Sequence, residues 1–275
     1  MFTASLLLIA LLSADVQSAP PPADDAGKVL VKKSGDALVT VQFVLKAEGA
    51  GEGGGDMEGE VECYGLLIDP NGLIVCSNSK LGGMSASVSQ MLSAMGQNIT
   101  AEPREIKIVV GQDGDEIPAE LIARDGELDL AWLRMKTPPP ADTPTVDLSQ
   151  PAQPHLGQDL VALARAGRFL GRPALSVRTQ LGGRVKKPRD MLLCTMRFNE
   201  PGVPVFADGR LLGLTVLQVP DADGGGDMNM AMGRLMSEIQ AVGMLVLPTE
   251  TIAKATTKAL EEAKNKPTAT SKSTD

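Results

Sequence analysis

Histidine and cysteine, which act as catalytic side chains and as metal ligands, are scarce in this sequence. It contains one histidine, His155, and three cysteines, Cys63, Cys76 and Cys194. A metal centre usually needs a cluster of such ligands, so their small number weakens a metal-binding interpretation. Histidine is the most frequent general base in enzymes, so His155 is the first candidate for that role.

Two other groups of polar residues offer different chemistry. Asp221, Asp223 and Asp227 lie close together, beside a Gly-Gly-Gly-Asp-Met segment that occurs twice in the chain. A calcium loop of the EF type needs acidic residues at alternate positions and a closing glutamate, which this segment lacks, so a flexible turn is favoured. Ser79 and Lys80 suggest a Ser-Lys dyad, but neighbours on an extended strand point to opposite faces, which disfavours it.

The composition is that of a globular protein and excludes some classes of function. Of 275 residues, 43% are hydrophobic and 22% are charged, enough to bury one large core or two small ones. Acidic residues outnumber basic ones by 34 to 26, and the aromatic residues are five Phe, one Tyr and one Trp. A nucleic-acid partner is not expected, because it favours a basic surface and stacking rings.

The N-terminus has the pattern of a signal peptide. Residues 4–12 form an apolar run that is too short for a membrane span, which needs about 20 residues. Small residues before Ala19 suit a cleavage site, so residues 1–18 are predicted to be a signal peptide and residues 19–27 a Pro-rich linker. The expected location is therefore secreted or periplasmic. Export permits disulfides, but Cys63 and Cys76 lie diagonally on the predicted hairpin, which leaves their pairing open.

Short apolar runs bounded by Gly and Pro predict strands from residue 29 onward. In the first half these runs are residues 37–45, 61–68, 73–76, 106–110, 117–123 and 128–135. In the second half they are residues 159–164, 174–181, 191–196, 203–206, 211–219 and 244–247. Six strands in roughly a hundred residues favour a closed antiparallel sheet. The fold class is therefore all-β, with two six-stranded barrels at residues 28–136 and 155–253.

The remaining segments connect or close these barrels. Residues 137–154 are rich in proline, which cannot sit inside a sheet, so they are predicted to form the linker between the barrels. Methionines at helical spacing predict one short helix within residues 85–95 and a second in the other half. A terminal helix capped by Thr249 is expected from residue 250 to about residue 265, of which residues 254–265 lie beyond the second barrel, before a disordered tail at residues 266–275.

Two such barrels with a crossing linker and a closing helix resemble the trypsin-like serine proteases, specifically their HtrA (Deg-type) branch. The run from Gly65 to Lys80 is similar to that family's G-[VF]-[IV]-I-D-x-x-G-x-I-[LV]-T-N-x-H-V, and Ser79 stands at the position of the catalytic histidine. Asp129-Leu-Ala-Trp-Leu resembles D-[LI]-A-x-[LI], which places Asp129 at the position of the triad acid. Residues 156–164 resemble V-G-x-x-V-x-A-[IL]-G, and His155 precedes them, so the resemblance offers no substitute base.

The nucleophile motif of that family, G-N-S-G-G-P-[LV], aligns with residues 199–205, Asn-Glu-Pro-Gly-Val-Pro-Val. Pro201 then stands at the position of the serine, and a second alignment deletes the serine altogether. Proline also has no backbone N–H to offer to an oxyanion hole. Residues 246–252 resemble the last strand of the family, [AI]-[IV]-P-x-x-x-[IV]. Losing the serine or the histidine alone costs such an enzyme about 10⁶ in turnover, so the resemblance implies an inactive member, a pseudoprotease.

The sequence thus predicts an exported protein without proteolytic activity and without a cofactor, which binds or scaffolds a polypeptide partner. Methionine at helical spacing is most often core filler, but soft Met surfaces also suit variable apolar partners. The candidate binding residues are Met84, Met91, Met95, Met232 and Met236. The main alternative is an active HtrA-like serine endopeptidase with a non-standard site, and a third is a module that binds a small ligand or a metal.

Overall fold

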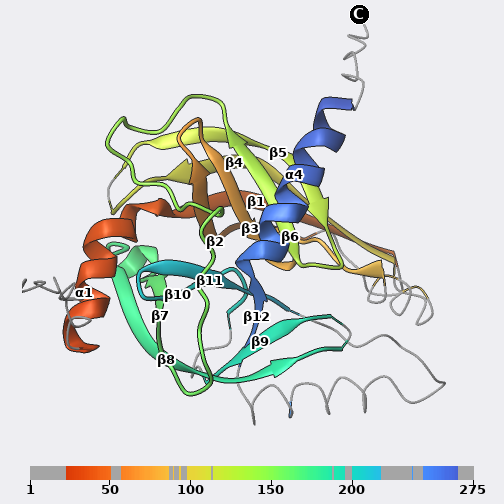
Figure 1. Cartoon of the computed structure of the whole chain (residues 1–275). Helices are drawn as coiled ribbons and strands as arrows, with labels where there is room; N and C mark the ends of the chain where they lie inside the picture. The colour runs from red at the N-terminus through yellow and green to blue at the C-terminus, as the bar shows by residue number, and fades with distance from the viewer. Residues whose placement is uncertain are drawn as a thin grey trace, which may run out of the picture.

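The computed structural model of the chain describes residues 23–50, 57–86, 89, 93, 98–112, 114–187, 189–195, 200–217, 237 and 244–265. These residues form two closed antiparallel β-barrels of six strands each, which lie one above the other in Figure 1. The predicted all-β fold class, with two six-stranded barrels and a C-terminal helix, is confirmed.

The first barrel is closed in the order β1-β2-β3-β6-β5-β4. Its strands are β1 (Leu38–Ala50), β2 (Met57–Asp69), β3 (Leu73–Ser77), β4 (Asn98–Val109), β5 (Glu116–Asp125) and β6 (Leu130–Met135). The predicted turn between β2 and β3 forms, because the N–H of Gly72 donates to the carbonyl oxygen of Asp69 at 3.0 Å and Gly72 adopts a φ of 82°. The predicted pairing of β4 with β5 also forms.

The second barrel is closed in the order β10-β11-β12-β9-β8-β7. Its strands are β7 (Asp159–Arg165), β8 (Ala174–Val185), β9 (Met191–Cys194), β10 (Pro204–Ala207), β11 (Arg210–Thr215) and β12 (Met244–Pro248). Residues 136–158, which include the predicted Pro-rich linker, contain no helix or strand and connect the two barrels.

Several strands are longer than the apolar runs that predicted them. β1 continues to Ala50 and stays paired with β4 as far as Asn98. β2 begins at Met57, and its Glu58 and Glu60 are exposed. These extensions are held by backbone pairing with the neighbouring strand. Residues 58–60 are all exposed, so this part of β2 lacks the apolar run by which the strands were predicted.

The helix α1 (Ala23–Ser34) was not anticipated by the sequence, which predicts a linker through residue 27. It leads through the short 3₁₀ turn η1 (Gly35–Ala37) into β1 and lies against β8 of the second barrel (Figure 1). A Cβ on Gly27 would come within 2.6 Å of the Ser176 hydroxyl, so the missing side chain allows this close approach. Leu30 and Ser34 are buried by the same packing, which stabilises a helix of low intrinsic propensity.

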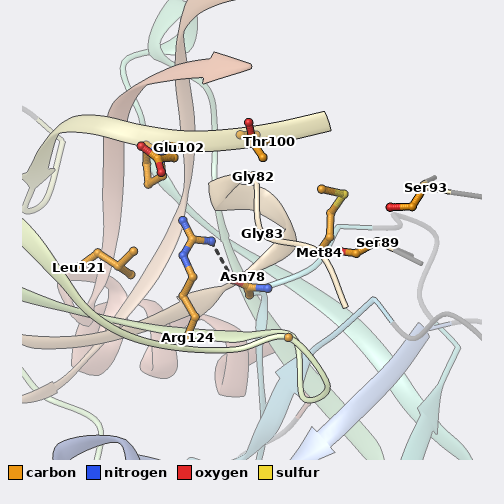
Figure 2. A pocket seen from close by; sticks show the side chains of 13 residues that line it. Asn78, Gly82, Gly83, Met84, Ser89, Ser93, Thr100, Glu102, Leu121 and Arg124 are labelled. Atoms are coloured by element: carbon orange, nitrogen blue, oxygen red, sulfur yellow. Dashed lines mark hydrogen bonds between the residues drawn. The ribbon is translucent and has the colours of Figure 1, made fainter. Parts of the chain in front are cut away.

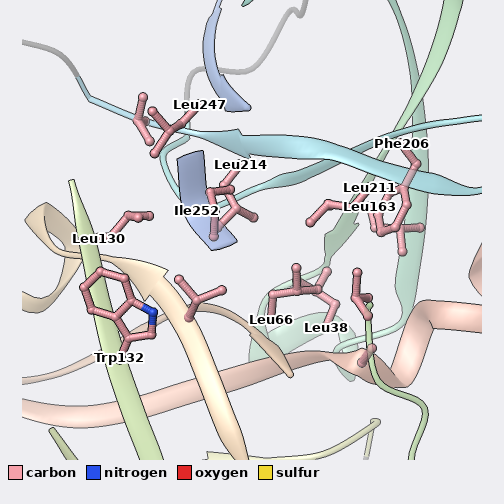
Figure 3. Packing of buried hydrophobic residues seen from close by; sticks show 14 of the residues in the cluster. Leu38, Leu66, Leu130, Trp132, Leu163, Phe206, Leu211, Leu214, Leu247 and Ile252 are labelled. Carbon is pink, nitrogen blue, oxygen red and sulfur yellow. The ribbon is translucent and has the colours of Figure 1, made fainter. Parts of the chain in front are cut away.

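Buried side chains from both barrels form one core between them (Figure 3). Leu66 and Trp132 contribute from the first barrel, Phe206 and Leu214 from the second, and Ile252 from α4 (Thr249–Asn265). Two further clusters fill the interiors of the barrels. The core between the barrels holds together the loops that flank the site described below.

The helix α4 crosses from β12 to the outside of the first barrel beside β5 (Figure 1). The indole N–H of Trp132 donates to the hydroxyl of Thr256 at 2.9 Å, which fixes this docking. α4 begins at Thr249, the residue predicted to cap it, and the hydroxyl of Thr249 donates to the carbonyl oxygen of Leu211 in β11 at 2.8 Å.

All three cysteines are free and buried, so the sequence's open question about Cys63 and Cys76 is answered. Gly65, not Cys63, lies opposite Cys76 across the hairpin, which gives the diagonal placement that the sequence predicts.

Candidate functional site

Asp129 is a buried carboxylate at the turn into β6. Its side chain and backbone are only 3% exposed, and its φ of 54° places the backbone in the left-handed region. Oδ1 accepts a hydrogen bond from the backbone N–H of Ser79 at 2.7 Å, and Oδ2 accepts one from the N–H of Leu217 at 2.9 Å. The hydroxyl of Ser77 lies 3.1 Å from both carboxylate oxygens. Asp129 therefore joins the end of β3 to the segment after β11.

Ser79 begins the 3₁₀ turn η2 (Ser79–Leu81), directly after β3. Its hydroxyl lies 2.9 Å from the hydroxyl of Ser77, which in turn donates to Asp129. A hydroxyl is a weak base, so this chain of oxygens contains no group that could accept a proton from a nucleophile at neutral pH other than the carboxylate itself. Burial raises the pKa of Asp129, and the hydrogen bonds from Leu217, Ser79 and Ser77 lower it in part.

The loop that contains Pro201 lies next to this serine pair. Gly202 adopts a φ of 90°, and a Cβ on it would lie 3.5 Å from the Cβ of Ser77. Nζ of Lys80 lies 3.1 Å from Oε1 of Glu200, so an ion pair also joins the two loops. The structure thus brings the segments around Ser79, Asp129 and Pro201 together at one place between the barrels.

Thr215 holds the loop around Pro201 in place by accepting hydrogen bonds from the backbone N–H groups of that loop. The N–H of Gly202 donates to the carbonyl oxygen of Thr215 at 2.7 Å, and the N–H of Val203 donates to its hydroxyl at 2.8 Å. The same hydroxyl donates to the carbonyl oxygen of Glu200 at 2.7 Å. The N–H groups that follow Pro201 therefore point at Thr215 and are not free to stabilise an oxyanion.

The geometry changes the sequence-based interpretation of Ser79 and Lys80 and agrees with that of His155. The argument against a Ser79-Lys80 dyad assumed that both residues lie on an extended strand and point to opposite faces, but both belong to the 3₁₀ turn η2. The Lys80 ammonium is nevertheless engaged by Glu200. His155 is exposed and donates its backbone N–H to Oε1 of Gln158, and it is not among the groups that contact Asp129.

A cavity of about 690 Å³ opens beside this network (Figure 2). Asn78, which lies between the two serines, forms part of its wall together with Arg124 of β5. Met84, one of the five candidate binding methionines, also lines it. Met91, Met95, Met232 and Met236 lie outside the described residues, as do the three aspartates of the alternative calcium loop.

Ser77, Thr215, Leu217 and Arg124 were not singled out from the sequence. The polar run Ser77-Asn78-Ser79 directly after an apolar strand was a usable signal for the first of these. The others contact the site from distant parts of the chain, so no local pattern marks them.

Two closed antiparallel six-stranded barrels with a buried acid between them define a protein of the trypsin-like class. A family model described as the trypsin-like peptidase domain matches residues 63–214, which is more than half of the chain, and the chain belongs to that family. No significant match was found among curated proteins. Within the part of the chain that the structure describes, no helix is long and apolar enough to cross a membrane.

Proposed function

We propose that this protein is a proteolytically inactive member of the trypsin-like family that binds a polypeptide partner after export from the cytoplasm. The observation that carries the proposal is the hydrogen bond from the Ser79 N–H to the buried Asp129 carboxylate, with a hydroxyl in the place where the family resemblance puts the base. Serine attack needs a hydroxyl, a base that takes its proton and an acid that orients the base.

The loop around Pro201 supports the same conclusion. A proline at the position of the nucleophile has no hydroxyl and no N–H. The next two N–H groups of the chain donate to Thr215. These N–H groups therefore hold the loop together and are not available to stabilise a tetrahedral intermediate.

The finer assignments rest on the sequence motifs. Matches along residues 65–80, 117–133, 156–164, 199–205 and 246–252, in that order, favour the HtrA branch. The apolar run at residues 4–12 favours a signal peptide and hence a secreted or periplasmic protein. A polypeptide is the natural partner, because trypsin-like folds present a surface between two barrels on which an extended peptide can lie.

The experiment treats the full chain with a serine-directed fluorophosphonate probe and with reduced, fluorescently labelled casein. We expect no covalent labelling, no cleavage and reversible binding of the unfolded casein. Ser79→Ala tests the rival active-protease function, with the exposed Ser149→Ala as the matched control. Labelling or cleavage that disappears in Ser79→Ala but persists in Ser149→Ala would overturn the inactive assignment. A stabilisation by calcium in a thermal-shift assay would favour the metal-binding alternative.

A further inference from the structure

The cavity beside Asn78 is bordered by charged and apolar groups from separate elements. Arg124 of β5 points into the space between Asn78 and Glu102 of β4 (Figure 2). Met84 and Leu121 add apolar surface to the wall. A volume of about 690 Å³ is within the range of sites that hold small ligands or a few residues of a peptide.

Arg124 is unusual among the partly buried arginines. Its Nη1 donates to Oδ1 of Asn78 at 2.8 Å and its Nη2 donates to the carbonyl oxygen of Leu81 at 3.1 Å, and both acceptors are neutral. No carboxylate within the described residues forms an ion pair with it. A guanidinium carries five N–H donors, and the described residues accept hydrogen bonds from two of those of Arg124.

Other buried or half-buried arginines of the same chain do have an acidic partner. Nη2 of Arg165 lies 3.3 Å from Oδ1 of Asp36, and Nη2 of Arg189 lies 3.7 Å from Oε2 of Glu127. Burial lowers the pKa of Arg124, which reflects the cost of holding a charge away from water. A cation held at such a cost beside an open cavity is well placed to receive an anion from outside the chain.

We propose that the cavity binds a carboxylate group of a polypeptide, with the Arg124 guanidinium as its charged donor and Met84 and Leu121 in contact with the neighbouring apolar side chain. This inference rests on the proposed polypeptide-binding function and assigns it a site. The carboxylate can come from the C-terminus of the partner or from an Asp or Glu side chain, and the experiment below separates these two sources.

Glu102 provides a test of whether the bound group is negatively charged. It is exposed at the rim of the cavity, and its negative charge lies near enough to Arg124 to raise the pKa of that arginine slightly. A carboxylate bound at Arg124 would be repelled by Glu102. Removing this charge by Glu102→Gln therefore strengthens the binding of an acid, whereas it would weaken the binding of an amine.

The experiment uses the full chain and two small probes, N-acetyl-leucine and N-acetyl-leucine amide, whose binding is followed by NMR titration. We expect the acid to bind more tightly than the amide. Arg124→Gln should weaken the binding of the acid about tenfold or more, and Glu102→Gln should strengthen it. Arg134→Gln is the matched control, because Arg134 is on the adjacent strand β6 but does not line the cavity. Equal binding of acid and amide, or of the acid to wild type and Arg124→Gln, would overturn the carboxylate site.

A second arm uses pooled synthetic heptapeptides with either a free C-terminal carboxylate or a C-terminal amide, captured on the immobilised chain. Retention of the free-acid pool alone identifies a C-terminus, and retention of Asp- or Glu-containing members of the amidated pool identifies a side chain. Peptides retained equally by wild type and Arg124→Gln keep the polypeptide-binding function and overturn its placement here. If N-acetyl-leucine binds through Arg124 but no peptide is retained, polypeptide binding is overturned and the anion site remains. If neither the small probes nor the peptides bind, both the carboxylate site and the polypeptide-binding function are overturned.

Discussion

Nζ of Lys80 lies 3.1 Å from Oε1 of Glu200, and this ion pair joins the first barrel to the second. Lys80 belongs to η2, which follows β3, and Glu200 belongs to the loop before β10. The pair therefore ties together the two segments that, in an active member of the family, would carry the base and the nucleophile. Their charges are used for cohesion between the loops.

The strength of this tie can be measured with a double-mutant cycle of Lys80→Gln and Glu200→Gln. Both side chains are 35% exposed, so solvent screens the attraction. We expect a coupling of about 0.2–1 kcal/mol in the free energy of unfolding, measured with urea, which decreases at high salt. The exposed pair Lys107 and Glu116, within the first barrel, is the control and should couple no more strongly. A coupling that does not change with salt would contradict the ion-pair interpretation.

Thr215 is expected to be more important for stability than its small size suggests. Its hydroxyl is fully buried, accepts from the N–H of Val203 and donates to the carbonyl oxygen of Glu200. Thr215→Val keeps the shape but leaves the buried N–H of Val203 and the partly buried carbonyl of Glu200 without this partner, which should cost about 1–3 kcal/mol in the free energy of unfolding.

Thr179 provides the matched control for this substitution. It is also buried, but its hydroxyl has no hydrogen-bond partner among the described residues. Thr179→Val should therefore be neutral or stabilising in the same denaturation assay, since it removes an unsatisfied polar atom. Equal losses in the two variants would show that the loss of a hydroxyl, and not its hydrogen bonds, governs the result.

The barrels could be predicted from the sequence because their signals are local. Short apolar runs bounded by turn residues mark the strands, and a turn such as Asp69-Pro-Asn-Gly72 fixes which neighbours pair. The helix α1 could not be predicted in the same way, because its stability comes from packing on β8, a strand more than a hundred residues later.

The candidate site was predictable only in part for the same physical reason. Ser79 and Asp129 lie in recognisable motifs, and the structure joins them by a hydrogen bond. Leu217 reaches Asp129 from 88 residues away, and Arg124 reaches Asn78 from 46 residues away. Contacts at these separations are products of barrel closure, and the residue types alone do not reveal them.

The three thiols are expected to be unreactive in the folded chain. Burial raises the pKa of Cys63 and of Cys194 to about 12 in each case, and it raises the pKa of Cys76 well above its usual value. The thiolate is the reactive species, so at neutral pH these groups should react with Ellman's reagent far more slowly than a free thiol. All three should react in guanidinium chloride. Rapid reaction of a thiol under native conditions would contradict the burial of that cysteine.

Asp129 should make the stability of the protein fall as the pH rises through the acidic range. Burial, the largest cause, raises the pKa of this carboxyl in the folded chain above its unfolded value of about 3.9. Its contribution to stability is therefore fully present below that unfolded value and is lost as the pH rises through the folded pKa. We expect the free energy of unfolding of wild type minus that of Asp129→Asn to decrease as the pH rises above the unfolded pKa of about 3.9.

Asp147 supplies a control of opposite sign for this titration. Hydrogen bonds from Ser149 lower the pKa of its exposed carboxyl, so its contribution is present above the unfolded pKa and is lost as the pH falls through the folded pKa. The difference between wild type and Asp147→Asn should then increase with pH below the unfolded pKa of about 3.9, whereas the Asp129 difference decreases above it. Because the other titrating groups cancel in each difference, two slopes of the same sign would show that burial does not dominate the titration of Asp129. In that case the hydrogen bonds from Ser79 and Leu217 would outweigh the cost of burying the charge, and Asp129 would stabilise the loops chiefly as an ionised acceptor.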